Sequence, residues 1–487
     1  MNINNADNVL LNDSVTHPEG SGILCPALVI SAPSSGSGKT TVTAALARYH
    51  RNQGKKVTVF KVGPDFIDPM ILQQASGELV YQLDLWIVGK KQCRELLYQA
   101  AQSADLILIE GVMGLFDGTP SSADIATYFN IPVLAVIDAA AMAQTFAAVT
   151  FGLAKYKQNL PFAGVIANKV SSDRHIEILE ASLDSQFTLF GRLPNEAAIT
   201  LPERHLGLVQ AQELQEIDSQ LDTAAAYIAK TKLVNLPPSV EFYTEAKVDN
   251  DGLLNLNDET PTTNEKALAN TRIAIVKDQA FNFIYAANIE FLEQAGATIL
   301  YCSALNDTVL PECDALYLPG GYPELYAQQL SNNVAFISAI RTFAQSNKPI
   351  IAECGGMLYL LEHLTDFNQQ QFEMVGLLPG TAVMNKRLTA IGSQSASLPC
   401  FGSSTTNDGH DNNNNEIIMR GHSFHYSSAK ISLTPVSQAR HFPSQRLGEY
   451  VYQHGNIIAS YMHWYLPSNP ALAIKLFQKA ASTNHNI

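Results

Sequence analysis

Short apolar runs alternate with longer amphipathic stretches between about residues 26 and 170. The runs ALVIS, VTVF, LILIE and VLAVID consist mainly of aliphatic and β-branched residues, and stretches such as TVTAALARYHRNQG lie between them. Short runs that are apolar throughout are typical of strands buried on both faces, and intervening helices are typical of a parallel sheet. The pattern therefore predicts an α/β domain with a parallel sheet over residues 26–235.

The same alternation restarts in the second half of the chain. The polar, acidic segment LPPSVEFYTEAKVDNDGLLNLNDETPTTNEK cannot easily bury a core, so we expect a linker over residues 236–270. The runs RIAIVKD, TILYC, ALYLPGG and PIIAECGG then predict a second α/β domain over residues 271–487. Within it, the tract SSTTNDGHDNNNN predicts a low-complexity surface loop over residues 393–415. We expect the polar residues 1–25 to form a disordered extension.

Length and charge narrow the choice of partners. A chain of 487 residues, 46% of them hydrophobic, can build more than one core. Its formal net charge of -14 opposes binding to nucleic acid or to an anionic membrane, so small molecules are the expected partners. No basic and apolar signal segment opens the chain, and no apolar run approaches the roughly 18 residues of a membrane span. These features predict a cytoplasmic protein.

A glycine-rich turn joins the first predicted strand to the first predicted helix. It has the sequence APSSGSGKTT and contains Gly36, Gly38, Lys39, Thr40 and Thr41. Glycines let successive backbone N–H groups face an anion, the lysine reaches the terminal phosphates, and the first hydroxyl binds magnesium. The strict P-loop pattern has a glycine where this turn has its proline, so the loop is a variant, and a simple turn before an ordinary helix is the alternative interpretation. We predict that these residues bind ATP and that Thr40 binds Mg²⁺.

Charged residues follow two further predicted strands. Lys61, Asp65 and Asp68 come after VTVF, and Glu110 ends LILIE. Because the C-terminal ends of parallel strands meet at one edge of a sheet, these side chains are expected beside the phosphate loop. Magnesium prefers carboxylate oxygens, and a transferred phosphate needs cations. We therefore predict that Lys61 binds phosphate and that Asp65 and Glu110 bind the metal and take part in catalysis, although a single carboxylate is more often an exposed or capping group.

A second reactive centre is predicted in the C-terminal half. Cys354 stands between the strand PIIAE and the helical run LYLLEHL, where a tight turn exposes the sulfur and the helix N-terminus stabilises a thiolate. His463 follows the strand NIIAS and is suited to act as the base for this thiol. His422 and His425 compete formally as bases, but their segment fits the wall of a substrate pocket or an interdomain passage better.

Glycine-rich backbone near the cysteine predicts an oxyanion site. Gly320, Gly321 and Tyr322 follow the strand ALYLP, and Gly355 follows the cysteine directly. The N–H groups of such turns can donate hydrogen bonds to a tetrahedral oxyanion. A lone cysteine is usually a small buried hydrophobe, but a glycine turn, a cysteine at a strand-to-helix turn and a histidine at a strand end form a much rarer set.

Seven ordered segments resemble the cobyrinic acid a,c-diamide synthase family over nearly the whole chain from about residue 26. They are SSGSGKTTVT, FKVGPDFIDP, LDLWIVG, IEGVMGLFDG, LPGGYPELY, AECGGMLYL and GHSFHYS. The N-terminal half looks like a P-loop NTPase-like domain of the dethiobiotin synthetase type, and the C-terminal half looks like a class I glutamine amidotransferase domain. Members of that class generally carry a glutamate two residues after the histidine, where this chain has Tyr465. The resembling branch likewise lacks this acid.

The resemblance implies a ligase of cobalamin biosynthesis. ATP with Mg²⁺ would phosphorylate the a and c acetate carboxylates of a cobyrinic acid-type corrinoid, and ammonia would attack each acyl phosphate to give an amide. Carried onto this chain, the triphosphate and magnesium contacts fall on Lys39 and Thr40. Glu110 and Asp65 become further metal or substrate-orienting acids, and Asp117 lies close to the reacting carboxylate.

The resemblance also assigns the source of the ammonia. L-glutamine would react with Cys354 to give a glutamyl thioester, with His463 shuttling the proton. Because ammonia that leaks into water is protonated, an enclosed route between the two centres is expected. A homodimer is possible.

Two kinds of alternative stay open. The same chemistry could act on hydrogenobyrinic acid or another tetrapyrrole, because the metal content of a macrocycle leaves no mark in the sequence. A P-loop switch or partition ATPase belongs to a different functional class, but it does not explain Cys354 and His463.

Overall fold

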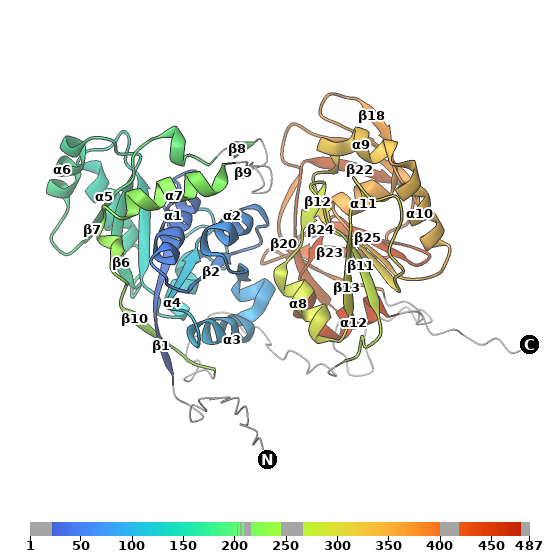
Figure 1. The fold of residues 1–487 in the computed structure, drawn as a ribbon, viewed down its shortest axis with the longest axis horizontal. Helices are drawn as coiled ribbons and strands as arrows, with labels where there is room; N and C mark the ends of the chain where they lie inside the picture. Colours follow the sequence, from blue (N-terminus) through green and yellow to red (C-terminus); the bar gives the residue numbers. More distant parts are fainter. Residues whose placement is uncertain are drawn as a thin grey trace, which may run out of the picture.

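Each half of the chain is built around its own sheet, and the two halves face each other across an interface (Figure 1). The computed structural model describes residues 22–201, 203–204, 207–208, 216–244, 266–399 and 418–478. The predicted α/β class of both halves is confirmed. Within the described residues, no helix is both long and apolar enough to cross a membrane.

The N-terminal sheet has the order β3-β2-β4-β1-β5-β6-β7, and neighbours along this path run parallel. Its strands are β1 (Ile23–Ser31), β2 (Val57–Val62), β3 (Tyr81–Leu83), β4 (Leu106–Glu110), β5 (Val133–Asp138), β6 (Phe162–Asn168) and β7 (Leu189–Arg192). One further strand, β10 (Ser239–Phe242), pairs antiparallel with β1.

Helices and short connections complete this half. They are α1 (Lys39–Asn52), α2 (Ile67–Ser76), the π-helical turn η1 (Leu85–Gly89), α3 (Lys90–Ala101), α4 (Ser122–Tyr128), α5 (Thr145–Lys155), α6 (Asp173–Ser182), η2 (Ala197–Ile199), β8 (Glu203–Arg204), β9 (Gly207–Leu208), α7 (Ile217–Ile228) and η4 (Lys232–Val234).

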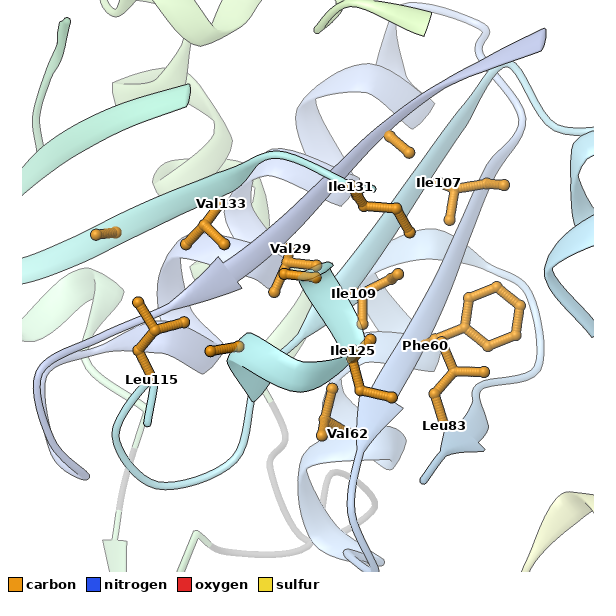
Figure 2. Packing of buried hydrophobic residues seen from close by; sticks show 14 of the residues in the cluster. Val29, Phe60, Val62, Leu83, Ile107, Ile109, Leu115, Ile125, Ile131 and Val133 are labelled. Carbon is orange, nitrogen blue, oxygen red and sulfur yellow. The ribbon is translucent and has the colours of Figure 1, made fainter. Parts of the chain in front are cut away.

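Alternate residues of the central strands pack on opposite faces of this sheet. Val29, Ile109 and Val133 belong to one buried cluster, as Figure 2 shows. Their neighbours Ile30 and Leu108 belong to the cluster on the other face. Strands covered on both sides must be apolar at every position, which explains the continuous apolar runs of the sequence.

The C-terminal sheet has the order β13-β11-β14-β16-β25-β24-β23-β20-β21-β26. The first five strands run parallel and the rest pair antiparallel. Its strands are β11 (Arg272–Val276), β13 (Thr298–Cys302), β14 (Ala315–Leu318), β16 (Ile350–Glu353), β20 (Ala390–Ser397), β21 (Ile418–His425), β23 (Ser437–His441), β24 (Leu447–His454), β25 (Ile457–Ser460) and β26 (His463–Trp464).

Smaller sheets and helices surround it. They are β12 (Phe281–Phe283), α8 (Ala286–Gln294), β15 (Gly320–Gly321), η5 (Pro323–Tyr326), α9 (Ala327–Asn332), α10 (Val334–Ala344), α11 (Gly355–Leu360), β17 (Leu361–Thr365), β18 (Gln371–Glu373), β19 (Leu378–Met384), β22 (Ser427–Ile431), η6 (Leu466–Ser468) and α12 (Pro470–Phe477).

Three expected boundaries differ from the structure. The predicted linker over residues 236–270 contains β10, which buries Val240 and Phe242 beside β1 because its residues alternate between exposed and buried. Residues 393–397 of the predicted loop belong to β20, whose backbone pairs with β21. Residues 23–25 of the predicted extension begin β1. Residues 1–21 of that extension, residues 245–265 of the linker and residues 400–415 of the loop lie outside the described residues.

Candidate functional site

The phosphate loop connects β1 to α1. Gly36 has φ 75° and Gly38 has φ 93°, conformations that favour glycine. A Cβ on Gly38 would lie 2.1 Å from Nδ2 of Asn168, which donates to the carbonyl of Ser37 at 2.9 Å. The Nζ of Lys39 donates to the carbonyl of Ser34 inside the loop at 3.2 Å and to that of Met113, on the turn after β4, at 2.6 Å. The loop is therefore shaped by close backbone packing and holds its lysine at the sheet edge.

Lys61 and Glu110 meet directly beneath this loop. They are Cα partners in the parallel register of β2 and β4, on the face of the sheet covered by α1. The Nζ of Lys61 lies 2.7 Å from Glu110 Oε1 and 2.6 Å from Asp68 Oδ2, and its distance to Asp65 Oδ2 is 3.8 Å. The side chain of Lys61 is only 2% exposed and that of Glu110 is fully buried. The single ammonium group of Lys61 thus faces three carboxyl groups.

Burial and these neighbours set the protonation of the acids. Burial raises the pKa of Glu110 to about 7, although Lys61 opposes the shift. Burial and the nearby Asp68 carboxylate raise the pKa of Asp65. Burial also works against ionisation of Asp68, but Lys61 outweighs it and holds this pKa below the usual value. A further cation beside these acids would therefore favour their ionised forms at neutral pH.

The residues at this point fit a magnesium ion. Thr40 Oγ1 donates to Glu110 Oε1 at 2.9 Å, and Glu110 Oε2 is buried with no hydrogen-bond partner in the described residues. In the described part of the chain, no group of three or more His, Cys, Asp or Glu side chains has metal-site geometry. Magnesium at phosphate sites usually takes only one or two carboxylates and completes its shell with water and substrate phosphates.

Asp117 lies on the turn that packs against the phosphate loop. Its Oδ2 accepts the N–H of Gly114 at 2.9 Å, and a Cβ on Gly114 would lie 2.6 Å from the carbonyl oxygen of Pro33. The N–H of Leu115 donates to Ala32 at 2.8 Å. Asp117 is therefore held near the loop, but it does not line the cavity between the domains.

Cys354 occupies a sharp turn between β16 and α11. Its φ of 42° and ψ of -107° are unusual for a residue with a side chain, and its N–H donates to the carbonyl of Ser460 at 2.7 Å. Such strain is typical of nucleophile turns. The residue is only 5% exposed, and burial, followed by the charge of Glu324, raises the pKa of its thiol. Burial thus opposes the thiolate that the sequence analysis expects at this helix end.

The oxyanion candidates lie beside this turn. A Cβ on Gly355 would lie 2.9 Å from the backbone nitrogen of Gly321. A Cβ on Gly320 would lie 2.1 Å from Cε1 of His463. The cysteine turn and the histidine ring therefore both pack against the Gly320–Gly321 segment, which only glycines permit. Tyr322 extends this segment toward the interface, where its ring packs edge-on against Phe283 at 4.9 Å.

His463 is buried next to a second histidine. Its ring stacks on that of His422, with centroids 4.9 Å apart, and its Nδ1 lies 3.9 Å from Oε2 of Glu353. Burial, together with His422 and His425, lowers the pKa of His463 well below its usual value. The imidazole is consequently neutral at physiological pH, as a base for a thiol must be.

His425 forms a separate buried pair. Its Nε2 lies 3.1 Å from Oε1 of Glu449, and its ring stacks on Tyr461 with centroids 3.7 Å apart. His422 instead shares a hydrogen bond of 2.7 Å with the hydroxyl of Tyr285. Both alternative histidines therefore already have strong partners.

A cavity of about 690 Å³ extends from the phosphate loop to the ring of His463. Nine of the candidate residues line it: Gly36, Gly38, Lys39, Thr40, Thr41, Lys61, Asp65, Tyr322 and His463. The other candidate residues do not line it: Glu110, Asp117, Gly320, Gly321, Cys354 and Gly355. The structure thus brings a phosphate loop from one half and a histidine from the other to one space.

Phe66 is a bridging residue that the sequence analysis did not single out. It follows Asp65 directly, yet its ring contacts His463 at 5.0 Å between centroids and stacks on Phe283 at 5.3 Å. A second interface contact pairs Trp86 with Phe442 at 4.6 Å. Both Phe66 and Trp86 stand in segments that carry the family resemblance, which was the available signal.

Comparison with known proteins gives matches over both halves. Residues 28–209 match the CobQ/CobB/MinD/ParA nucleotide binding domain, and residues 272–471 match the CobB/CobQ-like glutamine amidotransferase domain. A hydrogenobyrinate a,c-diamide synthase of Stutzerimonas stutzeri is 50% identical over 454 residues, covering 93% of this chain and 99% of the relative. The protein of that name from Pseudomonas aeruginosa is 48% identical, covering 94% and 98%. A cobyrinate a,c-diamide synthase of Herminiimonas arsenicoxydans is 43% identical, covering 92% and 96%.

Proposed function

Because the chain belongs to the cobyrinate and hydrogenobyrinate a,c-diamide synthase family, we propose that it uses ATP and glutamine to amidate the a and c acetate side chains of a corrin. The observation that carries this proposal is that Lys39 of the phosphate loop and His463 of the glutaminase half border the same cavity. A nucleotide switch has no use for such an arrangement, whereas a coupled ligase requires it.

Activation of the acceptor takes place at the sheet edge. A carboxylate oxygen of the corrin attacks the γ-phosphorus of ATP, ADP leaves, and an acyl phosphate forms. The loop N–H groups and Lys39 hold the phosphates, and Lys61 adds positive charge from below. Asp117, on the adjoining turn, supports the loop through its hydrogen bond with the N–H of Gly114.

Thr40, Glu110 and Asp65 are the residues that would hold magnesium, which supplies charge neutralisation for the transferred phosphate. Glu110 offers its unpartnered Oε2 for this purpose. Lys61 keeps Glu110 in place through the other carboxylate oxygen. Binding of the ion requires Glu110 and Asp65 to be ionised, so it releases the protons that burial retains.

Ammonia is generated at the cysteine turn. The thiol of Cys354 loses its proton to His463 as the sulfur attacks the amide carbon of glutamine. The Gly321 and Gly355 backbone stabilises the resulting oxyanion. His463 then returns the proton to the departing nitrogen, ammonia leaves, and water hydrolyses the glutamyl thioester to glutamate. A neutral, buried imidazole suits both proton transfers.

The corrin acceptor can be narrowed by the relatives. The proteins that are 50% and 48% identical carry the name hydrogenobyrinate a,c-diamide synthase, whereas the cobyrinate enzyme cited above is 43% identical. This favours the metal-free corrin, hydrogenobyrinic acid, as the acceptor over the cobalt-containing cobyrinic acid expected from the motifs alone.

The test is a direct assay of both corrins. The purified protein is incubated with ATP, Mg²⁺, glutamine and either cobyrinic or hydrogenobyrinic acid, and the product mass is followed. Gain of two amides supports the ligase function, and the preferred corrin is the one with the higher kcat/KM. Hydrolysis of ATP without amidation of either corrin would refute it.

Cys354→Ser separates the two centres. This variant should lose more than about 10³-fold of its glutamine-dependent rate, because an unactivated hydroxyl replaces the thiol, yet it should retain synthesis from ammonium salts. Loss of both activities would contradict the assignment of Cys354 to the glutaminase alone.

A further inference from the structure

The glutaminase half lacks the acid that normally orients a catalytic histidine. The position two residues after His463 is Tyr465, whose buried ring packs edge-on against Tyr285 and whose hydroxyl has no hydrogen-bond partner in the described residues. A base needs its proton on the ring nitrogen that faces away from the thiol, and an acid usually fixes that tautomer. Something else must hold the proton on Nδ1 of His463.

Glu353 reaches this nitrogen from the opposite direction. It ends β16, immediately before the nucleophile, and its Oε2 lies 3.9 Å from Nδ1 of His463. Its Oε1 accepts the N–H of Trp464 at 3.2 Å, which ties the carboxyl to the residue that follows the histidine. Both side chains are at most 2% exposed, and Nδ1 has no hydrogen-bond partner among the described residues.

We propose that Glu353 is the positioning residue that replaces the missing triad acid of the glutaminase. The separation of 3.9 Å is longer than a hydrogen bond, but catalytic hydrogen bonds are often long in the free enzyme and shorten when substrate binds. During thiol deprotonation the proton moves from sulfur to Nε2 of His463, while Nδ1 keeps its own proton. Glu353 then faces the positive imidazolium and stabilises it.

Among the residues that the structure describes, no lysine or arginine acts on the carboxyl of Glu353. Its carboxyl is faced by the Tyr317 hydroxyl of β14, the Tyr285 hydroxyl before α8, the His463 ring of β26 and the adjoining Cys354. Burial raises the pKa of Glu353 to about 8, partly offset by the Trp464 N–H. The carboxyl therefore gains its negative charge only as the pH approaches that value or as the imidazolium forms.

His425 with Glu449 is the rival pair, since its hydrogen bond of 3.1 Å is shorter. Two observations favour His463. The second nitrogen of His425 is already engaged with the carbonyl of Ser427 at 2.9 Å, so neither ring nitrogen is available to a thiol. His463 instead packs against Gly320 beside the cysteine turn.

Glu353→Gln is the decisive variant. The amide oxygen can still accept the Trp464 N–H, but the amide NH₂ then donates to Nδ1 and moves the imidazole proton to Nε2, the wrong tautomer. The kcat for glutamate release should fall by about 10²- to 10⁴-fold with little change in the KM for glutamine. Amidation from ammonium salts should stay within about twofold. Glu353→Asp, which keeps the charge, should recover part of the kcat.

Glu449→Gln is the matched control, because it converts the acid of the other buried pair and should leave kcat within a few-fold. Three outcomes would each overturn the proposal. Glu353→Gln could keep the full kcat for glutamate release, or it could lose ammonia-driven synthesis to the same extent. The kcat for glutamate release could also collapse in Glu449→Gln alone. The inference rests on the proposed glutaminase. If the unmodified protein fails to amidate a corrin from ammonium salts, the proposed ligase function is refuted. The role of Glu353 is decided separately, by the rate of glutamate release.

A measurement on the unmodified protein covers the case in which the variants do not fold. The rate of Cys354 alkylation by a glutamine-analogue electrophile should rise with pH and level off above about pH 8, once Glu353 is ionised and His463 holds its proton on Nδ1. A rate that keeps rising toward higher pH, as expected of an isolated buried thiol, would overturn the proposal.

Discussion

Replacing Phe66 by leucine should uncouple the two activities. Phe66 is 8% exposed, and its ring packs on Phe283, Tyr285, His422 and His463, with centroid distances from 4.7 to 5.4 Å. The backbone that carries it also carries Asp65 of the acid cluster. Any shift of this segment would therefore reach the histidine of the glutaminase through the Phe66 ring.

The size of the effect follows from the ring contacts. Aromatic pairs contribute about 0.5–1.5 kcal/mol beyond the burial of area, so losing this set costs about 2 kcal/mol or more across the interface. Leucine keeps most of the apolar volume, which avoids the cavity cost of about 3–5 kcal/mol expected for Phe66→Ala. A loss of 2 kcal/mol changes the ratio of closed to open interfaces by about 30-fold.

The assay measures amides formed per glutamine hydrolysed. The ratio should be close to one in the unmodified enzyme and should fall below about one half in Phe66→Leu, since ammonia escapes to water and is protonated. Phe60→Leu is the control, because Phe60 is also buried, at 1% exposed, but lies on β2 in the N-terminal sheet. It should lower thermal stability and leave the ratio unchanged. An unaltered ratio in Phe66→Leu, or an equal fall in Phe60→Leu, would refute the coupling role.

Three further predictions concern the phosphate site. Lys61→Met should lower the free energy of unfolding by about 3–5 kcal/mol, because it leaves Glu110 and its neighbouring acids buried without their cation, and denaturant titration checks this. Because the folded pKa of Glu110, about 7, exceeds its ordinary value of 4.5, its contribution to stability is complete below about pH 4.5 and is lost as the pH rises through 7. The free energy of unfolding of the ligand-free protein should therefore fall over that window. Binding of Mg²⁺ with nucleotide at pH 7 should release protons, which calorimetry in buffers of different ionisation enthalpy detects. Glu110→Gln should abolish the part of this proton release that comes from Glu110. Gly38→Ala should weaken nucleotide binding by more than about tenfold, since its Cβ would lie 2.1 Å from the side chain of Asn168. Gly54→Ala is the control, because Gly54 has a similar positive φ but open space around it, and it should leave the affinity unchanged. Equal affinities of the two variants would contradict the close packing of the loop.

The meeting of Lys61 and Glu110 at one edge of the sheet could be predicted because its geometry is local to a parallel sheet. Lys61 and Glu110 end neighbouring strands, and a parallel register carries strand ends to one edge. The apolar strands and the glycine-rich turn were visible for the same reason: each reflects short-range rules of burial and backbone conformation. The order of the strands and the depth of the charge cluster needed the structure, since they depend on which strands pair.

Boundaries were less predictable where few residues carry the signal. The strand β10 has four residues, and its alternation of Ser239, Val240, Glu241 and Phe242 is hidden within a segment of acidic and proline-rich composition. Its pairing with β1 joins residues more than 200 positions apart in the chain. Average composition describes such a segment poorly, because a tertiary partner decides its conformation.

Phe66 and Glu353 both lie beside the ring of His463. Each is next in sequence to a predicted site residue, Asp65 or Cys354, but its side chain contacts a different part of the molecule. In β16, Ile351 faces the same buried cluster as Trp464, while Ala352 faces the opposite cluster, so the period of two directs Glu353 toward β26 and away from the turn of Cys354. The sequence therefore contains the direction of this carboxyl, but not the strand that it meets. A carboxyl one residue before the nucleophile can act on the same ring nitrogen as the usual acid two residues after the histidine. The nucleophile and the base then follow two adjacent strands, β16 and β25, of one sheet.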